Sequence, residues 1–394
     1  MTRPRRLCMV VHGPYPVGEP RVAREARAAV DAGFEVDVVA MRTPGDPAHE
    51  RVEGIDVYRL ADLRSSRSRP RELVREYVGF ALLAGARVAR LHLRRRYGIV
   101  QVHNPPDFLT AAAVLPRLTG ARVVFDIHDL SPELFAARLG GSQRASLAER
   151  TLRWIESASV RLSDSVVTVH EPYRSELLAR GIPDEKIVVV LNALDERLLP
   201  PPKSARPSDG FRLVYHGTVT RLYGVELAVD ALALLATELP AARLEIYGDG
   251  DAVADVETRV EEHGLSDRVL VVGRILPQAE VLARVSGASA GVVAQLPIER
   301  NLHALPTKLL EYVALGIPVV APDIPAIQSS FGDDELLFFR AGNAASLAAA
   351  IRAVAADADA ARQRAEAALV RYRAKFRWEI YARRYVELLE RLLA

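Results

Sequence analysis

One segment of the chain combines residues that could bind a nucleoside diphosphate. Residues 301–325 read NLHALPTKLLEYVALGIPVVAPDIP. Pro306 favours the first turn of a helix, whose N-terminal amides stay unpaired and attract phosphate. Lys308 and Glu311 are three residues apart, so both project from one side of that helix. The pattern predicts phosphate binding near Thr307 and Lys308 and ribose binding by Glu311, and an exposed Lys–Glu pair is the alternative.

Two glycine-bearing turns could supply further backbone amides. Residues 13–18 read GPYPVG after the first apolar run, and residues 217–224 read GTVTRLYG after a later one. Glycine lets backbone amides approach a phosphate closely. Neither turn matches G-x-G-x-x-G or G-x-x-x-x-G-K-[ST], which disfavours a dehydrogenase or a P-loop ATPase. Ordinary tight turns are the alternative.

Histidines follow several apolar runs of strand length. In open parallel sheets, ligands bind beyond the carboxyl ends of the strands. The histidines in such places are His12, His103, His128, His170 and His216. His128 is the strongest candidate because the adjacent Asp129 could orient a neighbour or bind sugar hydroxyls; the alternative is that imidazole only bonds loop backbone there. No histidine pair has the spacing of two metal ligands on one helical face, so we predict no metal site.

The elements that must position these residues alternate along the chain. Short apolar runs are separated by longer stretches of helical periodicity, which predicts an α/β fold with two doubly wound, Rossmann-like domains built on parallel sheets. The predicted strands span residues 7–11, 36–40, 99–102, 123–127, 166–169, 187–191, 212–215, 244–247, 269–272, 291–294 and 318–321. Proline-rich residues 200–210 predict a linker between domains at 1–199 and 211–375. Residues 344–394 are predicted to be helical.

Composition and charge exclude several classes of protein. The 394 residues include 52 Lys and Arg and 50 Asp and Glu, a formal net charge of +2, so we expect no nucleic-acid partner. The single cysteine, Cys8, excludes an intramolecular disulfide. With no long apolar window and no signal-peptide core, we expect a cytoplasmic protein. Residues 71–96 predict a basic amphipathic helix that either covers the sheet or contacts the inner face of the membrane.

Motifs along nearly the whole chain resemble the family-4 retaining glycosyltransferases. Residues 306–325 look like the donor-site helix and following strand of that family. Similar matches are residues 215–232 (YHGTVTRLYGVELAVDAL), 244–251 (LEIYGDGD), 269–281 (VLVVGRILPQAEV), 13–39, 102–112 (VHNPPDFLTAA) and 123–134 (VVFDIHDLSPEL). The resemblance implies the glycosyltransferase-B fold, two facing doubly wound domains with a nucleotide sugar in the cleft. It also implies that the C-terminal helix, residues 376–394, packs back on the first domain.

The resemblance assigns roles to individual residues. Glu311 is implied to bind ribose, His128 to contact the donor sugar, and the backbone near Arg274 to meet the base. The implied donor-binding residues are Gly18, Gly217, Arg221, Arg274, Thr307, Lys308 and Glu311. The implied acceptor-side residues are His103, Asn104, Asp107 and Asp129.

Two positions depart from the family pattern. His303 stands where the family usually has a second glutamate, eight residues before Glu311, and we expect it to face the transferred sugar. Thr218 and Tyr223 replace a basic pair beside the second glycine turn. We expect Arg221, inside that turn, to supply the missing positive charge.

The resemblance implies transfer of a sugar, with retention, from a nucleoside-diphosphate sugar to an acceptor hydroxyl. We expect a UDP-sugar first and a GDP-sugar second, with a glycan, lipid or small molecule as acceptor. No metal or other cofactor is expected, because Arg221, Lys308 and helix dipoles can neutralise the diphosphate. The alternatives are a nucleotide-sugar epimerase and a non-catalytic nucleotide-sugar-binding partner of a transferase.

Overall fold

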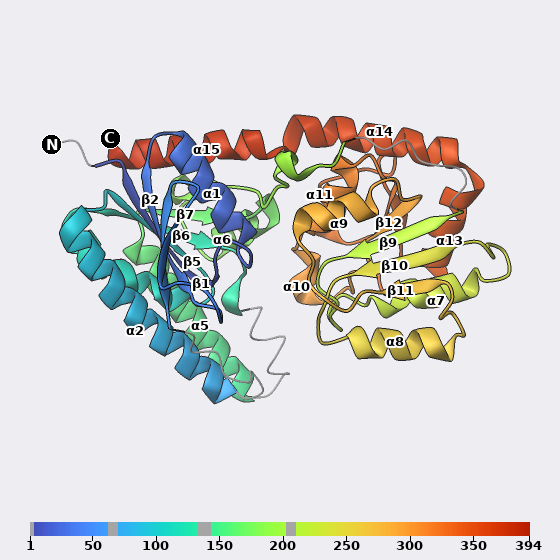
Figure 1. The fold of residues 1–394 in the computed structure, drawn as a ribbon, viewed down its shortest axis with the longest axis horizontal. Coiled ribbons are helices and arrows are strands. Elements are labelled where there is room, and N and C mark those ends of the chain that lie inside the picture. The colour runs from blue at the N-terminus through green and yellow to red at the C-terminus, as the bar shows by residue number, and fades with distance from the viewer. Residues whose placement is uncertain (1–3, 62–69, 133–142, 202–209) are drawn as a thin grey trace. The chain divides into compact units, whose positions relative to one another are not determined.

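The chain forms two α/β units, shown by a computed structural model that describes residues 4–61, 70–132, 143–201 and 210–394 (Figure 1). The first unit comprises Met1–Asn192 and Glu379–Ala394, and the second comprises Ala193–Trp378. Nearly all of the last helix, α15 (Trp378–Leu393), is therefore grouped with the N-terminal residues. Most of the predicted linker, residues 202–209, lies outside the described residues.

An eight-stranded sheet forms the centre of the first unit, in the order β3-β4-β2-β1-β5-β6-β7-β8. All neighbours pair in parallel except β3 and β4, which are antiparallel. The strands are β1 (Arg6–Pro14), β2 (Glu35–Met41), β3 (His49–Val52), β4 (Ile55–Leu60), β5 (Ile99–His103), β6 (Arg122–Ile127), β7 (Ser165–Thr168) and β8 (Ile187–Val189). The helices are α1 (Pro20–Asp31), α2 (Pro70–Arg95), η1 (Asp107–Ala113), α3 (Val114–Leu118), α5 (Gln143–Leu162), α6 (Glu171–Ala179), η2 (Asp184–Lys186) and α15.

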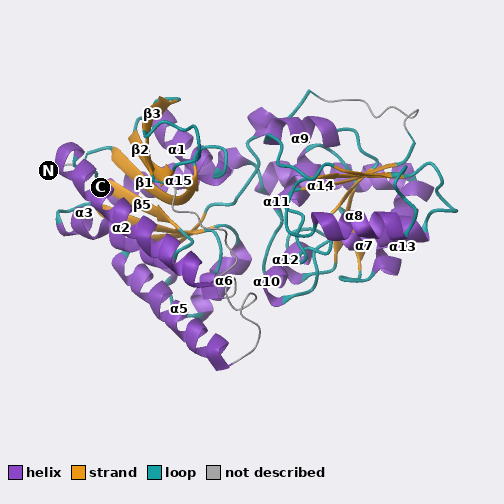
Figure 2. Cartoon of the chain, turned by 60° about the horizontal axis from the view of Figure 1, so that its bottom comes forward, coloured by secondary structure: helices purple, strands orange, loops and turns teal. Residues whose placement is uncertain are grey.

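Side-chain alternation along β5 separates an apolar face from a polar one. Val100 and Val102 join a buried cluster that includes Phe80 of α2. The intervening Gln101 and the terminal His103 point to the opposite face, because successive strand residues alternate. Helices α1 and α15 cover that second face, whereas α2 and α5 lie side by side on the first (Figures 1 and 2).

The second unit is built on a six-stranded parallel sheet in the order β11-β10-β9-β12-β13-β14. Its strands are β9 (Arg212–His216), β10 (Arg243–Tyr247), β11 (Val269–Val271), β12 (Ala290–Val292), β13 (Val319–Pro322) and β14 (Leu337–Phe339). Its helices are η3 (Glu196–Leu198), α7 (Glu226–Leu234), α8 (Val253–Glu262), α9 (Gln278–Val285), α10 (Glu299–Leu302), α11 (Thr307–Ala314), α12 (Pro325–Gln328), α13 (Ala344–Ala356) and α14 (Ala358–Lys375). A buried aliphatic cluster joins β9, β10 and β12 to α7, α8 and α13.

The predicted α/β fold is confirmed, and every predicted strand is present with ends that agree to within about three residues. The sequence prediction missed β3, β4 and β14. The edge pair β3 and β4 alternates buried or half-buried residues with more exposed ones, and β14 is three residues long, so none shows a continuous apolar run. The predicted helical region at 344–394 is confirmed as α13, α14 and α15.

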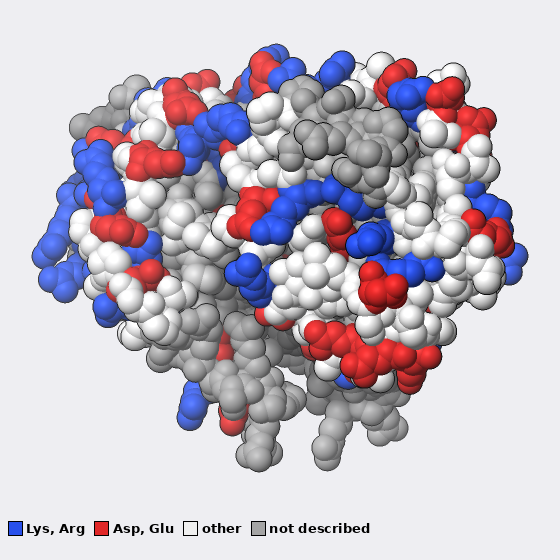
Figure 3. Space-filling view, turned by 45° about the vertical axis from the view of Figure 1, so that its right-hand side comes forward, with Lys and Arg blue, Asp and Glu red and all other residues white. Residues whose placement is uncertain are grey.

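Two surface properties bear on the partners of the chain. On the face drawn in Figure 3, Lys and Arg side chains lie among Asp and Glu side chains, in line with the formal net charge of +2. Across the described parts of the chain, no helix has both the length and the apolar character needed to cross a bilayer.

Candidate functional site

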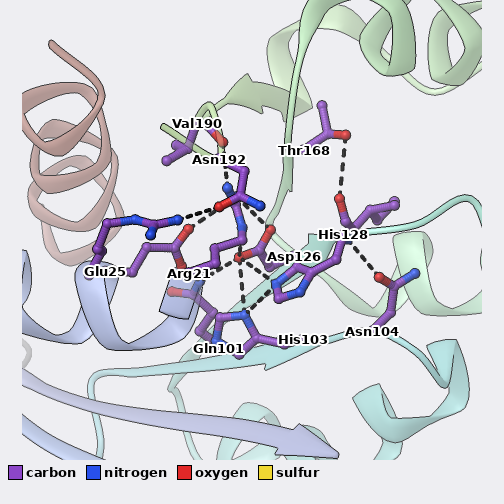
Figure 4. Close-up of polar contacts among 12 residues, drawn as sticks. Arg21, Glu25, Gln101, His103, Asn104, Asp126, His128, Thr168, Val190 and Asn192 are labelled. Atoms are coloured by element: carbon purple, nitrogen blue, oxygen red, sulfur yellow. Dashed lines mark hydrogen bonds and ion pairs between the residues drawn. The ribbon is translucent and has the colours of Figure 1, made fainter. Parts of the chain in front are cut away.

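A buried polar network lies behind His128 in the first unit (Figure 4). Pairing of β5 with β6 sets His103 beside Asp126, so the two side chains share the face that α1 covers. Arg21 of α1 donates hydrogen bonds to both carboxylate oxygens of Asp126, at 2.9 and 3.2 Å. Burial acts to raise the pKa of Asp126, but Arg21 and His128 outweigh it and hold that pKa well below its ordinary value. Asp126 is therefore a charged carboxylate at the centre of the network.

Asp126 orients two histidines. The Nδ1 atom of His103 lies 3.1 Å from Oδ2 of Asp126 and 3.0 Å from Nε2 of His128. The same His128 nitrogen lies 3.4 Å from Oδ2 of Asp126. Burial lowers the pKa of His103 to about 4, so this ring is neutral at pH 7. Because Nε2 of His128 faces the network, Nδ1 is the ring nitrogen that remains for a ligand.

The predicted acceptor-side residues His103, Asn104 and Asp107 are all buried. Asn104 accepts hydrogen bonds from the backbone N–H of His128 at 2.7 Å and of Asp129 at 3.3 Å. Its amide donates to Asp107 at 2.8 Å. These three buried residues hold the turn after β6 in place. The two predicted site residues in that turn, His128 and Asp129, are half-buried.

His103, Asp126 and His128 could also reach a single metal ion, since their ligand atoms lie within 4.8 Å of one another. Arg21, however, donates to both oxygens of Asp126, including the oxygen that the histidines share. A divalent cation there would lie beside the guanidinium and be repelled by it. The donor set fits a hydrogen-bonded network, and we assign no ion to it.

Sequence reasoning missed Glu19, the residue before α1. Its carboxylate lies over Gly13, where a β carbon would overlap it. Burial, and to a smaller extent Asp126 and Asp129, raise the pKa of Glu19 to about 7, although His128 opposes the shift. Glu19 therefore brings a partly protonated carboxyl group to the same sheet edge as His128. Its position between Gly18 and the helix-starting Pro20 was the available signal in the sequence.

Gly18 itself is set by the backbone of its turn. Its N–H donates to the carbonyl of Pro14 at 2.9 Å, and a β carbon at Gly18 would overlap Pro14. The backbone of the turn therefore requires glycine at the exposed position 18. A turn that faces a phosphate would require glycine there as well.

The second unit brings the predicted residues Gly217 and Lys308 together. Lys308, on α11, is 8% exposed, and its Nζ lies 3.8 Å from the ring centroid of Tyr215 on β9. The ring centroid of Tyr223 is 5.1 Å away. A β carbon on Gly217 would lie 3.4 Å from Nζ, so the ammonium group faces the glycine turn.

Glu311 lies one turn further along α11, on the same buried side as Lys308. Its Oε1 accepts a hydrogen bond from the Gln278 amide at 2.7 Å, and its Oε2 lies 3.1 Å from Nε2 of His216. Burial, together with Lys308, lowers the pKa of His216 to about 3, so His216 is neutral at pH 7. Gln278 and His216, which sequence reasoning did not connect to Glu311, fix the direction of its carboxylate.

The remaining predicted donor-side residues lie at the surface. Arg221 is exposed and donates to Asp255 at 2.5 Å, so it is the buried Lys308, and not Arg221, that lies against Gly217. Thr307, the first residue of α11, and Arg274 are exposed. Helix α11 thus brings a basic side chain, Lys308, beside the turn that carries Thr218 and Tyr223.

His303 follows the short helix α10 and pairs with a residue that sequence reasoning missed. Its Nε2 lies 3.2 Å from Oε1 of Glu299, one turn earlier. Both side chains are exposed enough to meet a ligand, at 37% and 77% of their full area. The carboxylate of Glu299 therefore lies beside His303, which stands where the family usually has a glutamate.

Comparisons with known proteins identify the family of the chain. Residues 18–193 match the family described as "Glycosyl transferase 4-like domain", and residues 200–371 match "Glycosyl transferases group 1". Glycogen synthase of Mycobacterium tuberculosis is 30% identical over 315 residues, which cover 77% of this chain and 72% of that protein. The 2-deoxystreptamine glucosyltransferase of Streptomyces kanamyceticus is 26% identical over 86% of this chain and 89% of its own.

Solved structures confirm the fold. Sucrose-phosphate synthase from Thermosynechococcus elongatus superposes with a TM-score of 0.79 at 22% identity, covering 98% of each chain. The Anabaena protein HepE, solved with UDP and glucose, gives a TM-score of 0.72 at 16% identity, covering 98% of this chain and 99% of its own. Both are similar to this chain in architecture across both units. The chain therefore belongs to the family-4 glycosyltransferases, has the glycosyltransferase-B fold and is a hexosyltransferase-type enzyme.

Proposed function

We propose that the enzyme transfers a sugar from a nucleoside-diphosphate sugar, UDP-sugar first and GDP-sugar second, to an acceptor hydroxyl with retention at the anomeric carbon. The observation that carries the proposal is that Lys308 and Glu311 lie on one buried face of α11, with Lys308 against the glycine turn at Gly217. A cation at that turn suits a diphosphate, and a carboxylate one helical turn further suits ribose hydroxyls. HepE, which has the same fold, was solved with UDP and glucose, which favours UDP as the first donor to test.

In the reaction the bond between the sugar C1 and the β-phosphate oxygen breaks, and the acceptor oxygen bonds to C1. Lys308 and backbone amides stabilise the negative charge that develops on the leaving diphosphate, so the proposal requires no metal. In the first unit, the half-buried His128 presents Nδ1 for sugar or acceptor hydroxyls, with Asp126 holding the imidazole orientation, and the half-buried Asp129 follows it in the same turn. The proton of the acceptor hydroxyl leaves with the diphosphate. The acceptor is a glycan, a lipid or a small molecule.

A thermal-shift screen across UDP, GDP, ADP and TDP sugars tests the donor. A ligand that binds only the folded chain raises its apparent stability. We expect the largest shift with a UDP-sugar. If all four nucleotides and their sugars at millimolar concentration leave the transition unchanged, the proposed donor class is wrong.

At the proposed sugar end of the site, His303 pairs with Glu299, and His303 departs from the family pattern. This departure favours a second candidate function, a nucleotide-sugar-binding partner that has no transferase activity of its own. That candidate predicts donor binding without transfer to any acceptor. An epimerase predicts a changed sugar without an acceptor. Incubating the protein with UDP-glucose alone and following the sugar protons by NMR separates the epimerase from both other functions.

The surface of α2 supports a further part of the proposal, contact with an anionic membrane. Val74, Val78 and Leu82 recur every four residues and are exposed, and Leu147 and Trp154 are exposed on the neighbouring α5. Among the described side chains of α2, the exposed charged ones are Arg75, Arg90 and Arg94, whereas the carboxylates Glu72 and Glu76 are half-buried and buried. Apolar side chains flanked by arginine suit anionic lipid headgroups.

Liposome flotation tests this contact. We expect the protein to float with vesicles of phosphatidylglycerol and phosphatidylcholine and to stay at the bottom with phosphatidylcholine alone. The variant Leu82→Glu should lose flotation, whereas Leu234→Glu, at an exposed position of the second unit, should retain it. Equal flotation with both kinds of vesicle would contradict an electrostatic contribution.

A further inference from the structure

Lys308 is a buried cation held by aromatic faces and not by a carboxylate. Its Nζ lies 3.8 Å from the ring centroid of Tyr215 and 5.1 Å from that of Tyr223. In the described part of the chain, no side chain or carbonyl accepts a hydrogen bond from this ammonium group, and no carboxylate lies within 4 Å of it. Cation–π contacts stabilise a lysine less than a buried ion pair would, so the charge at Nζ remains largely uncompensated.

The open side of this ammonium group is the turn after β9. Gly217 has φ +105°, and a β carbon there would come within 3.3 Å of Cε and 3.4 Å of Nζ of Lys308. The N–H of Gly217 donates to the carbonyl of Tyr247 at 2.9 Å, which fixes the turn against the next strand. A side chain at Gly217 would therefore crowd Nζ, and glycine leaves the backbone of the turn as the neighbour of the ammonium group on this side.

The groups that face Lys308 leave its pKa close to neutral pH, so that the protonated and neutral forms are both populated. Burial lowers the pKa of Lys308 to about 7, and Glu311 on the same helix opposes the shift without cancelling it. On β9, His216 is neutral because its pKa is lowered to about 3, and Tyr215 is neutral because burial raises its pKa well above the ordinary value. Tyr223 from the turn also faces Nζ, and Tyr312 of α11 packs edge-on against His216. With a pKa of about 7, Lys308 without a bound diphosphate is about half protonated at neutral pH.

We propose that Lys308 carries the positive charge for the diphosphate in this chain and that it takes up a proton from solvent when the diphosphate binds. This inference rests on the proposed function. A diphosphate beside Nζ supplies the counter-charge that the protein lacks, and a nearby opposite charge shifts the equilibrium toward the charged form. The neutral amine gains one proton from the buffer and becomes an ammonium ion, with no other bond made or broken.

Calorimetric titration with UDP at pH 8 in HEPES, Tricine and Tris measures the proton uptake, because the observed heat then depends on the ionisation enthalpy of the buffer. At pH 8 UDP is fully ionised, and a lysine with a pKa of about 7 is about nine-tenths neutral before binding. We expect an uptake of about 0.8 proton per UDP and none with uridine. The control Lys186→Met, a half-buried lysine of the first unit, should leave both the uptake and the affinity unchanged.

The variant Lys308→Met should lose the uptake and bind UDP about ten- to 100-fold more weakly, with uridine binding unchanged. Lys308→Arg retains a charge that does not titrate, so it should bind UDP at pH 8 with no uptake, and it keeps the test decisive if the methionine variant does not fold. UDP binding by the wild type without uptake, or uptake that survives in either variant, overturns the inference and leaves the proposed function standing. A wild type that binds no nucleoside diphosphate contradicts both.

Discussion

The hydroxyl of Tyr385, on the last helix, donates a hydrogen bond of 2.6 Å to Oε1 of Gln101, a residue 284 positions earlier in the chain. The amide of Gln101 in turn donates to Glu25 at 2.7 Å and to Asp126 at 3.2 Å. Helix α15 therefore reaches the buried network that orients His128. This contact explains why the last residues of the chain belong to the same compact unit as the first.

Replacing Tyr385 with phenylalanine should lower the free energy of unfolding by about 1 to 3 kcal/mol, because the buried oxygen of Gln101 loses its donor. Urea denaturation compared with the wild type measures the loss. Tyr58→Phe is the matched control, since the structure shows no hydrogen bond from the Tyr58 hydroxyl to any described residue. Equal destabilisation by the two variants would mean that the bond to Gln101 contributes nothing.

Glu19→Gln should stabilise the protein at pH 8 and leave its stability unchanged at pH 4. Folding raises the pKa of Glu19 from 4.5 to about 7, so the folded state favours the protonated carboxyl group. The stabilisation from this group is fully present below pH 4.5 and is lost as the pH rises through about 7. The gain at pH 8 should be roughly 1 to 3 kcal/mol, reduced by the partial exposure of the side chain.

Urea midpoints at the two pH values measure this effect. Glu35→Gln is the control, because the hydrogen bond from Arg6 lowers the pKa of Glu35 and the charged form is the favoured one there. That variant should give no gain at pH 8. A destabilised Glu19→Gln protein at pH 8 would show that the carboxylate is held by interactions favouring its charge.

His128→Ala should lower turnover more than it lowers affinity for bare UDP. The imidazole presents Nδ1 from the first unit, and we propose that it contacts sugar and not nucleotide. Steady-state rates with UDP-glucose and calorimetry with UDP measure the two effects separately. His49→Ala, an exposed histidine paired with Asp56, should change neither. Losses of similar size in rate and UDP affinity would place His128 outside the sugar site.

Glu311→Gln should weaken the binding of UDP and of uridine alike, as measured by calorimetry. A charge-assisted hydrogen bond to ribose is worth about 1.5 to 3 kcal/mol, which corresponds to about ten- to 150-fold in affinity. Glu280→Gln, on the exposed face of α9 where Glu280 pairs with Arg284, is the control for loss of one carboxylate. An unchanged affinity for uridine would remove Glu311 from the ribose site.

His303→Ala should spare UDP binding and change turnover or the preference among donor sugars. The ring lies at the surface beside Glu299, so its loss should not disturb the core, and melting temperatures should be unchanged. Rates with UDP-glucose, UDP-galactose and UDP-N-acetylglucosamine measure the preference. Wild-type rates with every accepted donor would leave His303 without a role in sugar recognition.

The sequence by itself determined the two α/β units, their strands and the helix that carries Lys308 and Glu311, because continuous apolar strands and helical periodicity are local patterns. Only the tertiary structure decided which polar residues work together. Asp126 reads as one residue of an apolar strand, yet parallel pairing sets it beside His103, and Arg21 reaches it from 105 positions away. The same holds for Lys308, which sequence spacing pairs with Glu311 but which in the folded chain faces Tyr215 and the turn at Gly217. Strand register and helix packing bring distant residues together, and no local pattern in the sequence encodes those distances.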